Sequence, residues 1–350
     1  GIPLIDTNKT NVTFLYRGRA DSMKLSGDFT SWAFKLKMKK LPDTDLFYLR
    51  LSFESDARLD YKFIANNKEV LDPLNKATAP SSYGERSELA MPDFTRAEEL
   101  HATYVAPKGK LATLTHSSGI LGYERTLYVY VPAGIDTNRL RLPVVFFQDG
   151  ADYVNFTKAP QILDNMIASK AIPPVLAVFV VPPVEKTRNR ITEYGMNDDY
   201  ARYFVTELIP FIDKKYNTTR KPADRHVIGP SFGGLASLFI GLRYPDSISN
   251  VASQSGYLSF SDDSLFTLVP IRSPRPFRVY IDIGTYERNV DGAALGSPDG
   301  DFLGGNRRLS RMLNQRGYRY MYREFHDGHS WGRWRNELPF ILRWFFSSGK

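Results

Sequence analysis

Residues 225–246, RHVIGPSFGGLASLFIGLRYPD, join an apolar β run directly to a helical pattern. The β run covers residues 226–228, and apolar residues then recur with helical spacing at Leu235, Leu238, Phe239 and Leu242. Between the two patterns, Gly229, Ser231 and Gly233 match the motif G-x-S-x-G. In this motif a sharp turn from strand to helix exposes a serine, and glycines flank the serine because larger side chains would clash. The stretch therefore predicts that Ser231 is a nucleophile in an α/β fold.

A serine nucleophile needs a general base within hydrogen-bond reach, and the base needs a third group to orient it. Folds with this motif carry the three groups in the chain order serine, acid, histidine. Two histidines follow Ser231, His326 and His329, both in the stretch REFHDGHSWGRWR. We favour His329, because it lies on a loop between a predicted strand at 318–325 and a predicted helix, whereas His326 is close enough to the strand to belong to it.

The acid is expected just past the preceding predicted strand, FRVYIDIG, at residues 277–284. Glu287, in GTYERN, follows the end of this strand and is the leading candidate. Asp282 is the second candidate. It ranks below Glu287 because it lies inside the strand, where its side chain points to one face of the sheet. Further acidic residues lie deeper in the same loop, at Asp291, Asp299 and Asp301.

An oxyanion hole needs two backbone N–H groups that point at the developing negative charge. We expect one from Phe232, the residue after the serine. The other is expected from Gly150 or Ala151, which follow a predicted strand at 143–148 in the stretch FFQDGADY. The alternative interpretation of this second segment is an ordinary Asp-Gly turn.

Three residues are candidates for contact with the substrate: Arg190, Trp331 and Trp334. Arg190 lies in RNRITEYGMND, ahead of a long predicted helix at 197–215, and the alternative for it is a solvated ion pair with Glu193. The two tryptophans follow His329 closely and could stack on a substrate ring, with packing in the core as the alternative.

The N-terminal part of the chain is rich in β signals. Residues 11–72 contain five short runs without helical periodicity, VTFLYRG, SMKLSG, FKLKMKKL, LFYLRLSF and LDYKFIAN, separated by turn residues. This pattern predicts an immunoglobulin-like β-sandwich. From residue 72 to about 107 the sequence is rich in Pro, Ser and Ala and predicts an ordered linker, so we expect domains at 1–95 and 96–350.

After residue 96, predicted strands and helices alternate. Strands at 111–116 and 125–131 adjoin through a short turn and predict an antiparallel pair. Later apolar strands are separated by helices, which is typical of a mainly parallel sheet covered on both faces. We expect these strands at 143–148, 175–181, 225–229, 249–254, 277–283 and 318–325, and helices at 159–169, 197–215, 232–244, 304–316 and 333–346. The pattern predicts an α/β-hydrolase with a mostly parallel central sheet.

Composition narrows the class of protein. No apolar run approaches the ~18 residues that a membrane span needs, so no membrane span is expected. The chain has no cysteine, which excludes disulfides and thiolate chemistry, and we expect neither a metal nor another cofactor. Its net charge of +8 comes from 46 Lys and Arg against 38 Asp and Glu. It indicates a mildly basic surface, with an adaptation to anionic partners as the alternative, and no nucleic-acid partner is expected.

Two properties of the whole molecule are less constrained. The chain opens at Gly1 rather than at a methionine, which favours a removed leader and a periplasmic or secreted location over a cytoplasmic one. No pattern in the sequence decides the oligomeric state.

These motifs resemble the enterochelin esterase family, the Fes-like branch of the esterase D hydrolases. The similar stretches cover nearly the whole chain: GPSFGGLASLFIGLRYPD, SQSG, RITEY ahead of ELIPFI, GHSWGRWR, and in the N-terminal part DPLN and SELAMP. The resemblance implies a β-sandwich lid domain followed by an α/β-hydrolase that cleaves trilactone catecholate siderophores. It also implies that Ser231, Glu287 and His329 form the catalytic set and that Arg190 lies near the substrate.

Two departures from the family pattern concern the substrate rather than the chemistry. Pro230 replaces the polar residue usual before the serine, and the segment after Glu287 is longer than its family counterpart. The stretch LSGDFTSW with YKFI also resembles the glycogen-binding-type sandwich that precedes feruloyl and acetyl-xylan esterases.

We therefore predict a serine carboxylic-ester hydrolase that acts on an aromatic, catecholate siderophore-type ester. The first alternative is a feruloyl or acetyl-xylan esterase, whose ester is linked to a plant polysaccharide. The alternative from another class is a non-catalytic ligand- or carbohydrate-binding protein on a hydrolase fold. The intact order of serine, acid and histidine argues against this last alternative, because a decayed site would be expected to lose a member.

Overall fold

The computed structural model describes residues 3–32, 35–82, 84–101, 106–271, 277–288, 290 and 301–347. It divides into two compact units. The first comprises Gly1–Arg96, Ile283–Leu303 and Glu324–Arg333, and the second comprises Ala97–Asp282, Gly304–Arg323 and Trp334–Lys350. Two segments from the C-terminal part of the chain therefore belong to the unit that holds the N-terminal strands.

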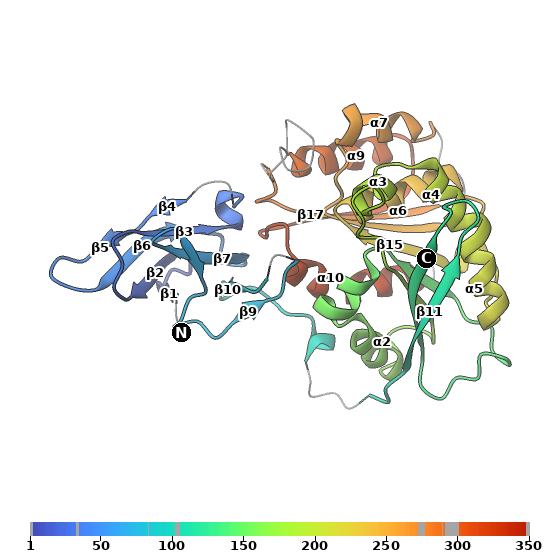
Figure 1. The fold of residues 1–350 in the computed structure, drawn as a ribbon, viewed down its shortest axis with the longest axis horizontal. Helices are drawn as coiled ribbons and strands as arrows, with labels where there is room; N and C mark the ends of the chain where they lie inside the picture. Colours follow the sequence, from blue (N-terminus) through green and yellow to red (C-terminus); the bar gives the residue numbers. More distant parts are fainter. Residues whose placement is uncertain are drawn as a thin grey trace. The chain divides into compact units, whose positions relative to one another are not determined.

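The N-terminal strands form two antiparallel sheets, which confirms the predicted β-sandwich (Figure 1). One sheet has the order β1 (Leu4–Ile5), β2 (Asn11–Arg17), β6 (Leu46–Ser52), β5 (Lys39–Lys40). The other has the order β4 (Leu36–Lys37), β3 (Met23–Gly27), β7 (Arg58–Ala65), β10 (Arg86–Ala90), β9 (Thr78–Ala79), with β8 (Lys68–Val70) beside β7. Buried side chains of both sheets, such as Phe14 and Phe63, share one apolar core.

Two expectations for this region were wrong. The run FKLKMKKL is not one strand, because β4 and β5 belong to different sheets and the buried Met38 between them packs into the shared core. The expected linker contains β9 and β10, and β10 lies between β7 and β9. The apolar periodicity of β10 is hidden because Ser87 and Glu88 are polar yet buried, with polar partners inside the unit.

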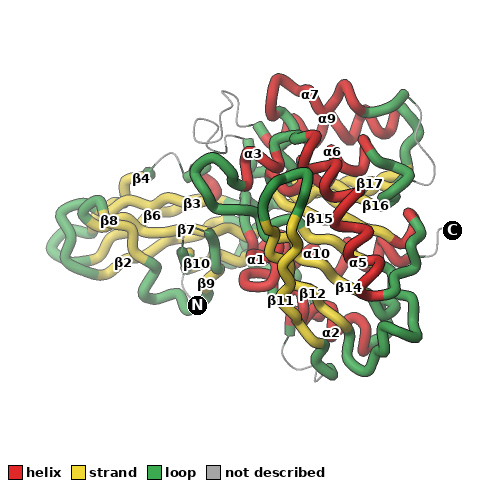
Figure 2. Tube along the Cα trace, turned by 45° about the vertical axis from the view of Figure 1, so that its right-hand side comes forward, coloured by secondary structure: helices red, strands yellow, loops and turns green. Residues whose placement is uncertain are grey.

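An eight-stranded sheet runs through the α/β part in the order β11, β12, β14, β13, β15, β16, β17, β18 (Figure 2). The antiparallel pair β11 (Lys110–Ser117) and β12 (Glu124–Val131) was predicted and is confirmed. The strands β14 (Leu176–Val180), β13 (Val144–Phe147), β15 (Arg225–Pro230), β16 (Asn250–Gln254) and β17 (Arg278–Gly284) are parallel neighbours. The last strand is β18 (Arg319–Phe325). This is the expected mostly parallel sheet of an α/β-hydrolase.

Among its described residues, the structure contains the predicted helices in the predicted order and three additional ones. They are α1 (Gly150–Asp152), α2 (Ala159–Ala168), α3 (Arg190–Tyr194), α4 (Asp198–Tyr203), α5 (Ile209–Tyr216), α6 (Phe232–Arg243), α7 (Phe260–Leu268), α9 (Phe302–Gln315) and α10 (Trp331–Phe346). A π-helical turn, Phe204–Leu208, joins α4 to α5 and accounts for the single long helix predicted there. The helices α1, α3 and α7 were not predicted. None of the helices in the described part of the chain combines the length and apolar character needed to cross a membrane.

Helices cover both faces of the eight-stranded sheet. His226 of β15 stacks on Phe345 of α10, with ring centroids 4.8 Å apart. The next residue of the strand, Val227, is in register with Val251, whose side chain lies against Gly241 of α6. Because successive residues of a strand point to opposite faces, α6 and α10 lie on opposite faces of the sheet. The strand ends that carry the candidate site are thus held by packing on both faces.

Candidate active site

Ser231 occupies the turn between β15 and α6. Its backbone has φ 56° and ψ −121°, a conformation that residues other than glycine rarely adopt. The surrounding backbone holds it there: the Ser231 N–H donates to the carbonyl of Gln254 at 2.8 Å, and the N–H of Tyr257 donates to the Ser231 carbonyl at 3.1 Å. The serine therefore sits at a constrained position at the carboxyl end of a central parallel strand.

The flanking glycines are explained by close approach of the chain to itself. A Cβ on Gly229 would lie 2.2 Å from the carbonyl oxygen of Gly233. A Cβ on Gly233 would lie 2.7 Å from a carboxylate oxygen of Asp149, which follows β13. Any side chain at either position would therefore push the turn away from its neighbours.

Glu287 and His329 meet in the first compact unit. The Nδ1 atom of His329 lies 2.6 Å from Oε2 of Glu287, a carboxylate with no exposed surface. The other carboxylate oxygen, Oε1, accepts the N–H of Gly284 at 2.8 Å. The ring of Phe302 packs edge-on against the imidazole of His329, with ring centroids 4.9 Å apart. Both oxygens of Glu287 thus have donors, and the imidazole is held through Nδ1.

The other candidates for acid and base lie elsewhere. His326 pairs with Asp56 at 2.6 Å, and both side chains are exposed. Asp282 is buried on β17, where its Oδ2 accepts the side-chain amide of Gln254 at 3.4 Å. Two candidates for the acid, Asp291 and Asp299, lie outside the described residues. Among the described side chains, the carboxylate of Glu287 is the one placed against Nδ1 of His329.

The candidate oxyanion donors lie at the first turns of two helices. Phe232 opens α6, and Gly150 and Ala151 open α1, so their N–H groups lie where a helix has no acceptor of its own. A Cβ on Gly150 would lie 2.3 Å from the backbone of Phe179, so this position has no room for a side chain. The segment is therefore a strand-to-helix connection and not an isolated Asp-Gly turn.

Arg190 connects these two helix starts. Its Nε and Nη2 atoms donate to the two carboxylate oxygens of Asp149 at 2.5 and 2.7 Å, and Nη2 also donates to the carbonyl of Pro230 at 3.1 Å. Burial opposes the charge of Arg190, but the Asp149 carboxylate more than offsets this effect and raises the pKa of Arg190 above its ordinary value. The expected solvated ion pair with Glu193 is not formed, because Glu193 is buried against Arg125 and Tyr123.

Both candidate tryptophans are largely buried. Trp331 is 6% exposed and Trp334 is 4% exposed. The indole N–H of Trp334 donates to the hydroxyl of Ser255 at 2.9 Å. Their stacking on a substrate ring stays a prediction.

Sequence reasoning missed Asp149, although it directly precedes the candidate oxyanion residues. This residue adopts a left-handed conformation with φ 55°, and its N–H donates to the hydroxyl of Tyr194 at 3.0 Å. The signal was its position directly before Gly150, in a segment that was predicted to supply an oxyanion donor or, alternatively, to be an Asp-Gly turn, but not to hold a partner of Arg190. Within the described residues, no group of three or more His, Asp and Glu side chains is arranged to hold a metal ion.

Comparisons with known proteins agree with this architecture. The Esterase family model matches residues 118–345. An uncharacterized protein of Bacillus subtilis, YjcH, is 29% identical over 66% of this chain and 95% of its own length. An iron(III) enterobactin esterase of Dickeya dadantii is 23% identical over 98% of this chain and 90% of its own length.

Two further similarities concern one curated protein and one solved structure. An endo-1,4-beta-xylanase/feruloyl esterase of Xylanibacter ruminicola is 26% identical over 50% of this chain and 24% of its own length. Among solved structures, the enterobactin esterase FES of Shigella flexneri superposes with a TM-score of 0.80 at 19% identity, over 97% of this chain and 94% of that one.

Proposed function

Since this chain belongs to the esterase family, in the enterochelin-esterase-like group of carboxylic ester hydrolases, we propose that it cleaves aromatic esters through an acyl-enzyme on Ser231. The observation that carries this proposal is the 2.6 Å contact between Glu287 and Nδ1 of His329. It supplies the oriented base that a serine nucleophile requires. The chain order Ser231, Glu287, His329 is the order of this fold.

In the proposed first step, His329 takes the proton of the Ser231 hydroxyl as the serine oxygen attacks the ester carbonyl. Because Nδ1 of the imidazole is bonded to Glu287, Nε2 is the nitrogen that accepts this proton. The buried carboxylate then stabilises the imidazolium that forms, and the imidazolium returns the proton to the leaving alcohol. In the second step His329 activates a water molecule, which releases the acid from Ser231.

The negative charge that develops on the ester oxygen needs donors that are already in place. We assign this role to the N–H groups of Phe232 and of Gly150 or Ala151. The bidentate pair between Arg190 and Asp149, together with the contact of Arg190 to the carbonyl of Pro230, supports this assignment because it ties both helix starts to one guanidinium. Donors held in a fixed geometry stabilise the developing charge more than flexible donors do, since they need no reorganisation during the reaction.

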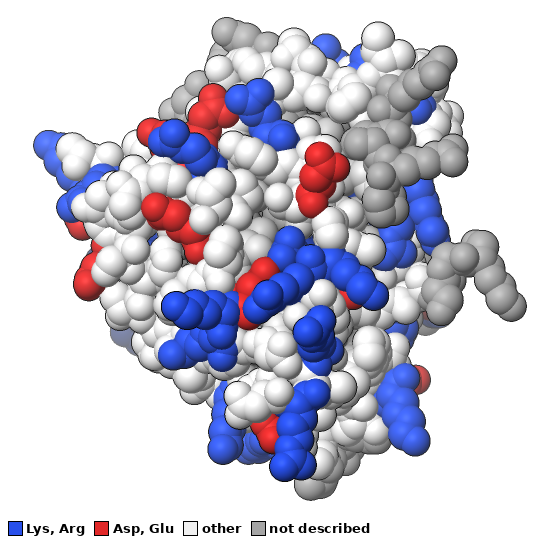
Figure 3. Space-filling model, turned by 90° about the vertical axis from the view of Figure 1, so that its right-hand side faces the viewer, with Lys and Arg blue, Asp and Glu red and all other residues white. Residues whose placement is uncertain are grey.

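Three observations support an aromatic and anionic acyl group. Arg190 has one nitrogen, Nη1, beyond the two that bind Asp149 and Pro230. Phe260 packs edge-on against Phe232 with ring centroids 5.2 Å apart and is half-buried, so it offers ring surface beside Ser231. Basic side chains cover more of the face drawn in Figure 3 than acidic ones do, in keeping with the net charge of +8. A catecholate siderophore ester, the substrate type of the enterobactin esterase relatives, fits this chemistry.

A feruloyl or acetyl ester of a plant polysaccharide is the second candidate substrate. The similarity to the xylanase/feruloyl esterase of Xylanibacter ruminicola favours it, as does the stretch LSGDFTSW in the β-sandwich. A feruloyl group is also aromatic, so both candidates predict that an aromatic acyl group is preferred to acetyl.

The first test is whether Ser231 is the nucleophile. With p-nitrophenyl esters, the intact protein should release p-nitrophenol in a burst that matches the concentration of sites. Ser231→Ala should lose the burst and at least ~10³ in kcat while its circular dichroism is unchanged. Turnover retained by Ser231→Ala would reject Ser231 as the nucleophile. No turnover by the intact protein would instead favour a non-catalytic binding protein.

The second test compares kcat/KM for a catecholate trilactone, methyl ferulate and acetylated xylan. Aromatic esters should exceed acetyl esters by more than about 10-fold, which corresponds to about 1.4 kcal/mol and is within reach of one stacked ring. The trilactone should be the best of the three. Acetylated xylan as the best substrate would make the polysaccharide esterase the assigned function.

A further inference from the structure

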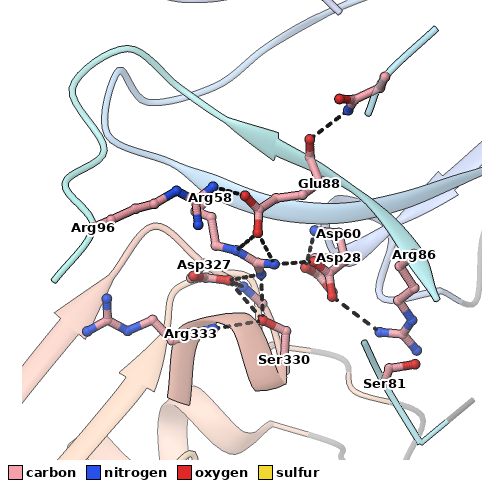
Figure 4. A network of polar contacts seen from close by, with 12 residues as sticks. Asp28, Arg58, Asp60, Ser81, Arg86, Glu88, Arg96, Asp327, Ser330 and Arg333 are labelled. Carbon is pink, nitrogen blue, oxygen red and sulfur yellow. Dashed lines mark hydrogen bonds and ion pairs between the residues drawn. The ribbon is translucent and has the colours of Figure 1, made fainter. Parts of the chain in front are cut away.

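Arg58 is a fully buried cation on β7 of the sandwich. Its side chain is 1% exposed and donates to Asp60 at 2.6 Å and to Glu88 at 2.8 and 3.0 Å (Figure 4). A third carboxylate, that of Asp327, lies 3.5 Å from it. Because Asp327 belongs to the segment Glu324–Arg333 of the same compact unit, the guanidinium joins the sandwich to the segment that carries His329.

The contact reaches the residue next to His329. Nη1 of Arg58 donates to the hydroxyl of Ser330 at 2.7 Å. The same hydroxyl accepts the N–H of Arg333 at 3.3 Å, so Ser330 caps the first turn of α10. On the other side of the histidine, the backbone N–H of Arg58 donates to the carbonyl of His326 at 2.9 Å. One residue of β7 therefore holds the chain before and after His329.

The loop packs closely against the sandwich at two glycines. A Cβ on Gly328 would lie 2.2 Å from the carboxyl carbon of Asp28, and a Cβ on Gly332 would lie 2.1 Å from Nη2 of Arg58. The two glycines on either side of His329 thus lie directly against sandwich side chains. A change in the position of Arg58 or Asp28 would therefore be passed to the loop at Gly328 and Gly332, where the packing is close.

Burial of so many charges is a costly way to stabilise a fold. Arg58 faces three carboxylates, while Arg96 pairs with Glu88 and Arg86 lies 3.9 Å from Asp60. Replacing a buried ion network by apolar side chains is often neutral or stabilising, so such a network is weak support for a role in stability alone. Its contacts on both sides of His329 point to a role in placing that residue.

We infer that Arg58 positions His329, and that it does so through its contacts with Ser330 and with the carbonyl of His326. This inference rests on the proposed function, since it assumes that His329 is the base. The geometry that must be kept is the 2.6 Å contact between His329 and Glu287. A displacement of about 1 Å in a reacting group can cost about 10² in rate, even when the substitution lies far from the chemistry.

Two substitutions test the contact from its two sides. Arg58→Lys keeps the charge that balances the buried carboxylates but loses the planar fork that spans Glu88 and Ser330. Ser330→Ala removes the acceptor on the loop. The matched control is Tyr61→Phe on the same strand, which removes a buried hydrogen bond to Asp72 at 2.6 Å. The folded fraction is measured by near-ultraviolet circular dichroism, and the active sites are counted by burst titration.

We expect Arg58→Lys and Ser330→Ala each to lower kcat per titrated site by about 10- to 100-fold, with KM little changed. The kcat per site of the double variant should be no more than about 3-fold below that of the worse single variant, because both substitutions remove the same contact. Tyr61→Phe should lower the unfolding midpoint, keep kcat per site within about 3-fold, and combine additively with Ser330→Ala.

The outcomes separate this inference from the proposed function. Turnover that survives Ser231→Ala or His329→Ala overturns the proposed function and the role of Arg58 with it. Loss of turnover in those two variants, combined with kcat per site in Arg58→Lys and Ser330→Ala no lower than in Tyr61→Phe, overturns the positioning role alone. Additive losses in the double variant also overturn it, because independent effects on stability would then explain both substitutions.

Discussion

Replacing Glu287 with glutamine keeps the shape of the side chain but changes one of its two acceptor oxygens into a donor NH2 group. In the native protein Oε1 accepts the N–H of Gly284 at 2.8 Å and Oε2 faces Nδ1 of His329 at 2.6 Å. Glutamine has one acceptor for these two positions. The substitution therefore forces a choice between the backbone donor and the imidazole.

If the amide oxygen stays on Gly284, the NH2 group faces Nδ1 of His329. The imidazole must then carry its proton on Nε2, and this tautomer cannot take the proton of Ser231. If the amide turns over, Nδ1–H keeps its acceptor but the buried N–H of Gly284 loses its own. An unsatisfied buried donor costs about 1–3 kcal/mol, so the active orientation is disfavoured by about 10- to 100-fold.

The active orientation is also weaker than in the native protein. A hydrogen bond to a charged acceptor is about twice as strong as one to a neutral acceptor, so the imidazolium loses about 1–1.5 kcal/mol of stabilisation. This adds about another factor of 10. We therefore expect Glu287→Gln to lower kcat by about 10²–10³ with a small effect on KM.

The assay is steady-state turnover of a p-nitrophenyl ester, normalised to sites by burst titration, with the unfolding midpoint measured in parallel. Asp282→Asn is the matched control, since Asp282 is also a buried acidic residue after Ser231 in the chain and its Oδ2 accepts from Gln254. It should lower kcat far less. If Asp282→Asn is the more damaging of the two, the acid is Asp282 and the reasoning from the Glu287 contact is refuted.

Two further predictions concern charged side chains. Arg190→Ala should lower kcat for every ester by about 10², because the loop of Asp149 and the carbonyl of Pro230 lose their common donor. It should raise KM only for anionic aromatic esters. An unchanged kcat for p-nitrophenyl acetate would contradict this prediction. Burial raises the pKa of Asp60 from 3.8 to about 6 against the opposing effect of Arg58. Its contribution to stability is therefore full below about pH 4 and is lost as the pH rises through 6. Denaturant titrations give the free energy of unfolding of Asp60→Asn minus that of the wild type. This difference should increase by on the order of 3 kcal/mol from pH 4 to pH 8. A difference that is constant with pH would contradict the raised pKa of Asp60.

The parts of the fold that sequence could predict are those encoded by local patterns. The turn at Ser231 joins a strand and a helix within a few residues, and Gly229 is needed because of its close approach to Gly233 in the same turn. The parallel strands are continuous apolar runs, because both of their faces are covered. The antiparallel pair β11 and β12 was predicted from the short connection between its two strands.

The parts that sequence could not predict depend on long-range polar contacts. Glu88 lies in a buried strand but resembles a surface residue, because its partner Arg58 is 30 positions away. Arg58 and Ser330 are separated by 272 positions, and neither shows a pattern that would connect them. Met38 illustrates a third case, in which a chain with regular alternation crosses from one sheet to the other.

The hold of β7 on the chain around His329 has a consequence for how such genes can evolve. Arg58, which contacts Ser330 in the His329 segment, is encoded 272 codons upstream of Ser330. A recombination event that exchanged only the 5′ part of the gene would separate the histidine from the arginine that fits it. Substitutions at position 58 and at positions 327–330 are therefore expected to be inherited together, so that homologous sequences should show them changing in concert.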